Sequence, residues 1–148
     1  MSRIRFALLL AVLSLGLAGC SARGQAFHPS LITASGGNST IIVYRLSQFT
    51  GKAYTADIVL DGQPMGELKN GGFITAAVPP GPHVVEIDKS ILETGGRYPT
   101  AINAEPGRAY FVRYDQRAVP PLPVVLDGFS IVPPDQAVQE LRELRESR

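Results

Sequence analysis

The sequence predicts an all-β fold, an antiparallel β-sandwich of seven or eight strands with one amphipathic helix at the C-terminus. Three observations support this expectation. From residue 40 onward, the chain consists of short runs rich in β-branched and aromatic residues. Turn signals separate these runs at intervals close to the eight to twelve residues that are typical of sandwiches. No long helical periodicity interrupts the pattern before residue 133.

The candidate strands are short, and several of them alternate between apolar and polar residues. In the run from 54 to 60, Tyr54, Ala56, Ile58 and Leu60 share one face, as expected of a strand with one buried side. A Pro at position 99 indicates an edge strand. The runs expected to be strands are 41–46, 54–60, 65–68, 73–78, 83–88, 98–104, 108–115 and 122–132.

Three turn signals determine how these runs connect. Asp61-Gly62 and Asn70-Gly71 predict tight turns, because glycine tolerates the positive φ that a two-residue hairpin turn needs. Pro79-Pro80-Gly81-Pro82 predicts a rigid corner that leads into His83. We therefore interpret a set of six residues as structural turn positions: Asp61, Gly62, Asn70, Gly71, Gly81 and His83.

The predicted helix occupies residues 133–148. Pro133-Pro134-Asp135 suits a helix start, because proline is tolerated in the first turn and an acidic residue favours the positive end of the helix. The apolar residues of the segment then recur at helical spacing and form one stripe: Ala137, Val138, Leu141 and Leu144.

Residues 1–19 have the composition of a secretory signal peptide. Arg3 and Arg5 precede an apolar stretch over 6–17, and the small residues Ala18 and Gly19 follow it. The apolar stretch is too short to cross a bilayer.

Leu17-Ala18-Gly19-Cys20 resembles the bacterial lipobox. This resemblance implies cleavage before Cys20 and acylation of that cysteine by fatty acids such as palmitate. Ser21, in place of Asp, implies delivery to the outer membrane in Gram-negative bacteria, on the side that faces the periplasm. The alternatives are an ordinary cleaved signal with an incidental cysteine, or an anchor in the inner membrane.

Composition excludes several classes of site. Cys20 is the only cysteine, so the chain has no internal disulfide, cysteine zinc cluster or CxxC redox pair. Residues 1–19 contain two arginines and no acidic residue, so 12 basic and 13 acidic residues remain, a net charge of −1. A chain without a basic run lacks the electrostatic footprint of a nucleic-acid-binding protein. Membrane attachment therefore depends on the lipid.

Residues 20–39 are expected to form a flexible tether between the lipid and the sandwich, which would occupy 40–132. The segment contains several Gly, Ser and Asn residues and few large apolar ones. About twenty such residues reach on the order of 25 Å. Phe27, Leu31 and Ile32 could dock locally.

No catalytic, metal or cofactor motif is present. His28 is expected in the tether, and two histidines do not supply the three or four ligands of a zinc site. His83 is expected to donate to a carbonyl of the proline-rich corner; its alternative role is that of a base or a metal ligand. Gly51-Lys52 lacks the first glycine and the Ser or Thr of a phosphate loop. Tyr110, Val112 and Tyr114 are expected in the core, with a ligand-stacking strip as the alternative.

The segment from Ile41 to Tyr114 resembles a family of bacterial envelope lipoproteins called domain of unknown function 2846. It is also similar to small immunoglobulin-like sandwich modules of the PEGA type. These resemblances imply a fold and a location, and no activity or functional residue. They rest on turn and strand motifs: Tyr44-Arg45, Val59-Leu60-Asp61-Gly62, Gly66-Glu67-Leu68, Asn70-Gly71, Val78-Pro79-Pro80-Gly81 with His83, and Gly107-Arg108-Ala109-Tyr110-Phe111-Val112.

The sequence therefore predicts a non-enzymatic binding or structural module, anchored in the cell envelope through Cys20. The expected partner is another envelope protein or a cell-wall glycan. The alternative is a hydrolase that acts on envelope material, with His83 and a nearby carboxylate as its catalytic groups. A polar cleft around His83 with two converging carboxylates would favour the hydrolase. A closed corner and an exposed apolar patch would favour the module.

Overall fold

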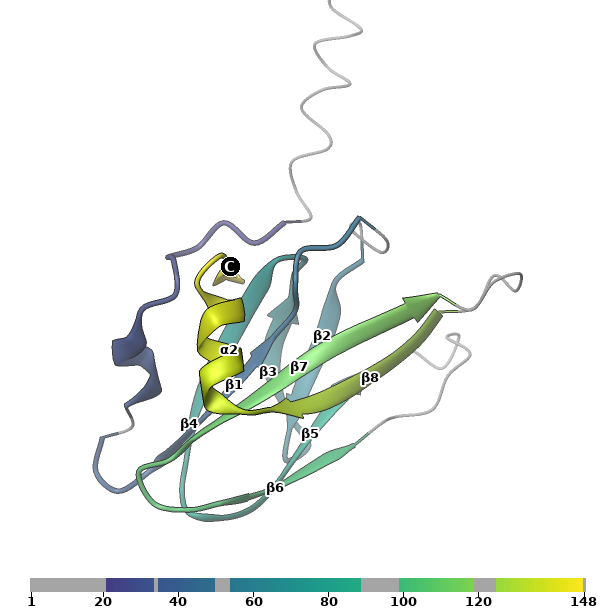
Figure 1. Ribbon diagram of the computed structural model, residues 1–148. Coiled ribbons are helices and arrows are strands. Elements are labelled where there is room, and N and C mark those ends of the chain that lie inside the picture. The colour runs from purple at the N-terminus through teal and green to yellow at the C-terminus, as the bar shows by residue number, and fades with distance from the viewer. Residues whose placement is uncertain (1–20, 34, 50–53, 89–98, 119–124, 148) are drawn as a thin grey trace, which may run out of the picture.

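The computed structural model describes residues 21–33, 35–49, 54–88, 99–118 and 125–147. The predicted signal peptide and Cys20 lie outside these ranges, as do parts of the predicted runs 98–104 and 122–132. Two β-sheets pack face to face, and helix α2 (Pro134–Leu141) lies on the outer side of the larger sheet (Figure 1). The prediction of a β-sandwich with a helix near the C-terminus is confirmed.

The larger sheet has five strands in the spatial order β8 (Val125–Val132), β7 (Ala109–Ala118), β1 (Ser39–Tyr44), β4 (Gly72–Val78) and β9 (Arg145–Glu146). The smaller sheet has four strands in the order β3 (Gln63–Leu68), β2 (Ala56–Leu60), β5 (Gly81–Asp88) and β6 (Thr100–Ala104). A 3₁₀-helix, η2 (Pro29–Ile32), precedes β1. The described ranges thus hold one strand more than the sequence predicts.

The strand pairing departs from a purely antiparallel sandwich in two places. β1 pairs in parallel with β7, and β4 pairs in parallel with the two-residue strand β9. Strands that join through a tight hairpin must be antiparallel, but strands far apart in the sequence are free to run in the same direction. The whole smaller sheet lies between β1 and β7 in the sequence, so no turn signal could reveal their relative direction.

Strand β1 has no exposed residue, because both of its faces are covered. Ile41 and Val43 face the smaller sheet and belong to the inner core of the sandwich. Ile42 and Tyr44 belong to a second core under α2, together with Leu141 and other apolar residues. This double burial explains why the run has no alternation of polar and apolar residues.

The expectation of a free tether over residues 20–39 requires correction for the described part of the segment. The backbone N–H of Gly24 donates to the carbonyl of Glu146 at 2.9 Å, and the N–H of Glu146 donates to the carbonyl of Gln25 at 2.9 Å. The ring of Phe27 packs edge-on against Phe73, with 5.7 Å between the centroids. The physical reason is that two apolar side chains, Phe27 and Ile32, complete the second core.

The predicted helix over 133–148 also requires correction, because α2 ends at Leu141. Leu144 is buried in the second core, and its N–H donates to the carbonyl of Leu141 at 3.0 Å. Arg145 and Glu146 then pair with β4 as strand β9. The predicted apolar residues therefore do share one buried face, but Leu144 reaches it through the turn after α2 and not through the helix.

Candidate functional site

The Asp61-Gly62 pair forms the turn between β2 and β3. Both residues have positive φ, 52° and 77°, which is the geometry of a two-residue hairpin turn. Asp61 also binds the neighbouring strand β5: its N–H donates to the carbonyl of Val84 at 2.9 Å, and its Oδ1 accepts from the N–H of Val84 at 2.8 Å. The turn thus fixes the second carboxylate oxygen, Oδ2, next to β5.

His83 connects this turn to the proline-rich corner. Its Nδ1 lies 2.6 Å from Oδ2 of Asp61, and its Nε2 lies 2.8 Å from the carbonyl oxygen of Pro79. The His83 side chain is 8% exposed. Because a carbonyl oxygen and a carboxylate oxygen both accept, each ring nitrogen donates when the ring carries two protons. The corner therefore favours the imidazolium form of His83.

The ionisation of the pair agrees with this geometry. The hydrogen bond to Asp61 raises the pKa of His83 above its usual value and outweighs the opposing effect of burial, and the bond to the Pro79 carbonyl acts in the same direction as the Asp61 bond. Partial burial works to raise the pKa of Asp61, but the hydrogen bonds from His83 and from the Val84 N–H lower it overall. The arrangement is an ion pair with its hydrogen bonds satisfied.

A general base needs an unprotonated nitrogen within reach of a substrate. The ring nitrogens of His83 are instead both engaged within the fold, and the ring contacts one carboxylate, not two converging ones. A depression of about 140 Å³ lies near the β2–β3 turn, but His83 does not line it. Its lining residues are Val59, Gly62, Glu86, Ile87 and Asp88.

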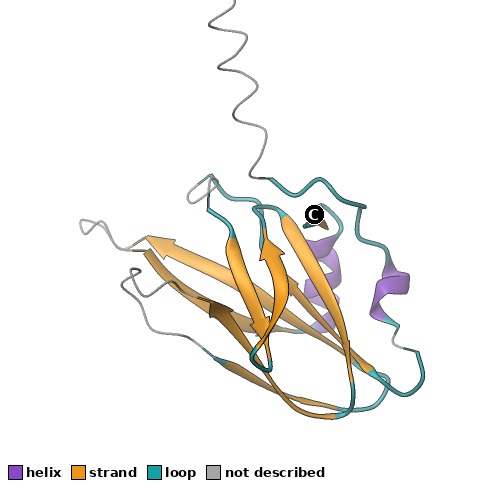
Figure 2. Cartoon of the chain, turned by 180° about the vertical axis from the view of Figure 1, so that it is seen from behind, coloured by secondary structure: helices purple, strands orange, loops and turns teal. Residues whose placement is uncertain are grey.

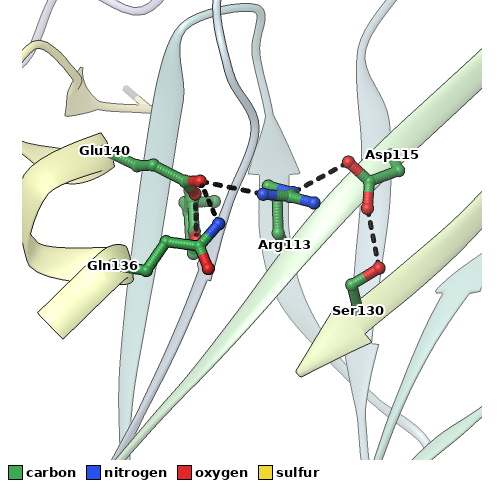
Figure 3. Close-up of polar contacts among 6 residues, drawn as sticks. Arg113, Asp115, Ser130, Gln136 and Glu140 are labelled. Atoms are coloured by element: carbon green, nitrogen blue, oxygen red, sulfur yellow. Dashed lines mark hydrogen bonds and ion pairs between the residues drawn. The ribbon is translucent and has the colours of Figure 1, made fainter. Parts of the chain in front are cut away.

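A second polar cluster joins α2 to the larger sheet (Figure 3). Arg113 on β7 donates from Nη1 to Oε1 of Glu140 and from Nε to Oδ1 of Asp115, both at 2.9 Å. Tyr44 donates to the other oxygen of Glu140 at 2.5 Å, and Ser130 donates to Oδ2 of Asp115 at 2.8 Å. The cluster is a clamp that holds the helix on the sheet.

The clamp perturbs the groups that it contains. Burial and the hydrogen bond to Glu140 raise the pKa of Tyr44 far above its usual value. Burial also opposes ionisation of Glu140, but hydrogen bonds from Tyr44, Gln136 and Arg113 together lower its pKa. Both groups therefore hold their ordinary neutral-pH charge states, and neither Tyr44 nor Glu140 is an acid or base poised near neutrality.

The third polar cluster surrounds a buried arginine. Arg45 is 2% exposed and donates from Nη1 to the carbonyl of Tyr54 at 2.6 Å and from Nη2 to Oε1 of Gln116 at 2.7 Å. Its guanidinium carbon lies 5.7 Å from the ring centroid of Tyr114, in cation–π range. The hydroxyl of Tyr114 and the amide of Gln116 both donate to Oδ1 of Asp127, at 2.9 and 3.1 Å.

Sequence reasoning did not assign a role to Arg45, although a usable signal was present. Ile41, Val43 and Arg45 are two residues apart, so a strand that continued through Arg45 would place all three side chains on the same inner face of the sheet. A charge at an inward position needs a partner, because an isolated buried charge is very costly. Burial lowers the pKa of Arg45, and Asp127 supplies the opposing charge.

The other predicted positions lie as follows. His28 caps η2, where its Nδ1 accepts from the N–H of Ser30 at 3.2 Å, and it takes no part in the His83 corner. Val112 and Tyr114 lie in the inner core, as expected of a core stripe. Gly71 and Gly81 have positive φ, 67° and 137°.

Asn70 is buried and binds two segments of the chain. Its side-chain Oδ1 accepts from the N–H of Gln48 at 3.0 Å, and its carbonyl accepts from the N–H of Ala22 at 3.2 Å. Asn70 thus does more than turn the chain.

No three His, Cys, Asp or Glu side chains of the described residues lie close enough to hold a metal ion. No helix within the described ranges is long and apolar enough to cross a bilayer.

The fold and these clusters define a small β-sandwich module with a helix clamped on one outer face. The chain belongs to the family described as "Protein of unknown function (DUF2846)", whose model matches residues 35–129. This match extends beyond the 41–114 segment on which the sequence resemblance rests. Neither the search of curated proteins nor the search of solved structures found a match.

Proposed function

We propose that the protein is a lipid-anchored module of the bacterial cell envelope, which acts by binding or by structure and not by catalysis. Leu17-Ala18-Gly19-Cys20 supports the anchor, because it resembles the bacterial lipobox and follows the basic and apolar parts of a signal peptide. Ser21 favours the outer membrane, with the module on its periplasmic side. The partner is another envelope protein or a cell-wall glycan.

The observation that carries the non-catalytic part of the proposal is the pairing of both His83 ring nitrogens. One contacts Asp61 and the other contacts the Pro79 carbonyl, on a side chain that is almost fully buried. An envelope hydrolase that used His83 would need to break one of these contacts before the imidazole could accept a proton. The geometry therefore favours a structural role for His83 over the hydrolase alternative.

A binding role also finds support on the surface. Ile131, a large apolar residue on β8, is 58% exposed. An open depression of about 450 Å³ lies beside α2, and charged and apolar side chains line it together. The lining residues are Pro134, Asp135, Val138, Gln139 and Arg142.

Mass spectrometry of the protein from its native host tests the anchor. We expect a mature chain that begins at an acylated Cys20, and we expect Cys20→Ser to leave the protein unprocessed or released from the membrane. A mature chain that starts elsewhere and carries no acyl group would refute the anchor.

Crosslinking in intact cells, followed by purification, tests the binding role. We expect a defined envelope protein or glycan fragment to be recovered with the wild-type protein, and less of it with Arg142→Glu, which reverses a charge beside the α2 depression. Gly128→Ala, on β8, is a control that adds only one methyl group to open space. Recovery of the same crosslinks from all variants would contradict a role for the α2 surface.

A further inference from the structure

Two segments that are far apart in the sequence meet at Asn70. Ser21 forms a bridge with Asn70, and the N–H of Ala22 donates to the Asn70 carbonyl. On the other side, the N–H of Gln48 donates to the Asn70 side chain. The start of the described chain and the segment after β1 lie at the same end of the molecule in both views (Figures 1 and 2).

This end carries the most exposed large apolar side chain of the described residues. Phe49 directly follows Gln48 and is 94% exposed, whereas Ile131 on β8 is 58% exposed and Leu31 on η2 is 39% exposed. An aromatic ring in water forgoes the stabilisation that burial would give it. The N–H of the preceding residue, Gln48, donates to Asn70, which places Phe49 at this end of the molecule.

The same contacts leave very little free chain between the domain and the predicted lipid on Cys20. Ser21 is already held at Asn70, and consecutive Cα atoms are about 3.8 Å apart. An acylated Cys20 would therefore place the membrane interface at this end, and not on the order of 25 Å away as a free tether would allow. Ser21, Ala22, Ser47 and Gln48 are uncharged, and the charged residues next to these contacts, Arg23 and Lys69, are basic.

We propose that this end of the sandwich lies directly on the lipid bilayer and that Phe49 inserts into the interface beside the acyl chains of Cys20. The proposal rests on the lipid anchor described above. Two or more acyl chains suffice to hold a protein on a membrane. Phe49 therefore sets the orientation of the module, and its loss leaves the protein bound but free to tilt.

Depth-dependent fluorescence quenching tests the orientation in the full-length lipidated protein. Acylation uses the only native cysteine, so a thiol introduced at Gln48→Cys is the single site for a fluorescent label. The labelled protein is reconstituted into phosphatidylcholine and phosphatidylglycerol vesicles, with and without brominated phospholipid. A second protein, labelled at Ile131→Cys, provides an exposed control position on β8.

We expect brominated lipid to quench the label at position 48 several-fold more strongly than the label at position 131. Adding Phe49→Ser should lower the quenching at position 48 at least twofold while flotation with the vesicles is unchanged. Equal quenching at both positions in a protein that is acylated and floats would overturn the orientation and leave the anchor intact. A protein that carries no acyl group would overturn the anchor itself, and the orientation with it.

Discussion

At the scale of single residues, His83 was a candidate catalytic base, but both of its ring nitrogens form hydrogen bonds within the fold. Three prolines in four residues supply no N–H donors at the corner, so the Pro79 carbonyl depends on another donor. His83 provides that donor, and Asp61 holds the opposite side of the ring. The sequence predicted the carbonyl contact; the Asp61 contact required the hairpin to fold back on β5.

Substitution of His83 should therefore affect stability before it affects any cellular role. His83→Ala removes the hydrogen bond to the Asp61 carboxylate and the donor to the Pro79 carbonyl. The loss of hydrogen bonds that involve charged groups costs about 1–3 kcal/mol, and the melting temperature should fall. His83→Asn and His83→Gln should recover part of the loss, because an amide also donates. Thermal unfolding measures the effect. A His83→Ala protein with unchanged stability and a lost cellular role would favour the hydrolase alternative.

The pH dependence of stability should carry the signature of the same pair. The pKa of His83 is raised in the folded state, so its stabilising contribution is complete below the unfolded value of about 6.5 and is lost as the pH rises through the higher folded value. The pKa of Asp61 is lowered, so its contribution is complete above the unfolded value of about 3.9 and is lost as the pH falls through the lower folded value.

Urea unfolding of the wild type and of His83→Gln, from pH 3 to pH 9, checks both signs. We expect the difference in stability between the two proteins to be largest between the unfolded values of the two groups. It should shrink at either end of the range. A difference that stays constant with pH would show that the ion pair adds nothing to the hydrogen bonds.

At the scale of secondary-structure elements, local signals located the Asp61-Gly62 hairpin turn correctly. Asn70-Gly71 is not a hairpin turn, because it connects β3 to β4, which lie in different sheets. The Asp61-Gly62 turn follows from the backbone freedom of two adjacent residues, so the sequence suffices to locate it. The sequence does not suffice to locate the end of α2. Leu144 lies in the second core although the helix has already ended, and the following residues pair with β4. The direction of β7 beside β1 is likewise a property of the assembled sheet.

The β2–β3 hairpin provides a test in which backbone strain is separated from steric clash. A Cβ added at Gly62 would meet no atom within 4 Å, but its φ is +77°, which side chains rarely adopt. Gly62→Val should therefore destabilise the protein by more than the ~1 kcal/mol of an ordinary glycine substitution. Gly128→Ala, also in open space and without a positive φ, is the control and should change stability little. Equal melting temperatures for both variants would exclude a strained turn at Gly62.

At the scale of the whole molecule, the N-terminal segment and the C-terminal strand complete one surface together. Residues 24–26 lie along β9, and Phe27 and Ile32 reach the second core, which α2 and the larger sheet form. Composition predicted a flexible tether and left open that Phe27, Leu31 and Ile32 dock locally. Phe27 and Ile32 do pack against the second core, whose residues come from distant parts of the chain. The buried Arg45 was missed for a related reason: the partners in its contacts come from two distant parts of the chain, Tyr54 and strand β7.

We predict that loss of the Phe27 ring releases the N-terminal segment from the second core and from β9. Phe27→Ala removes the ring that packs on Phe73, a loss of about 1.5 kcal/mol for a large apolar side chain. The amides of Gly24 and Glu146, which donate across the segment to Glu146 and Gln25, should then exchange with solvent about tenfold faster. Amides of the buried strand β1, such as that of Val43, should keep their protection, because the inner core is unchanged.

Hydrogen exchange followed by NMR separates the two groups of amides, and Leu31→Ala is the matched control. Leu31 lies in the same segment, but its side chain is 39% exposed and is not part of the second core. Its truncation should leave the exchange of Gly24 and Glu146 as in the wild type. Rapid exchange of these amides already in the wild type would mean that the segment behaves as a tether, and the short distance between Ser21 and the bilayer would no longer hold.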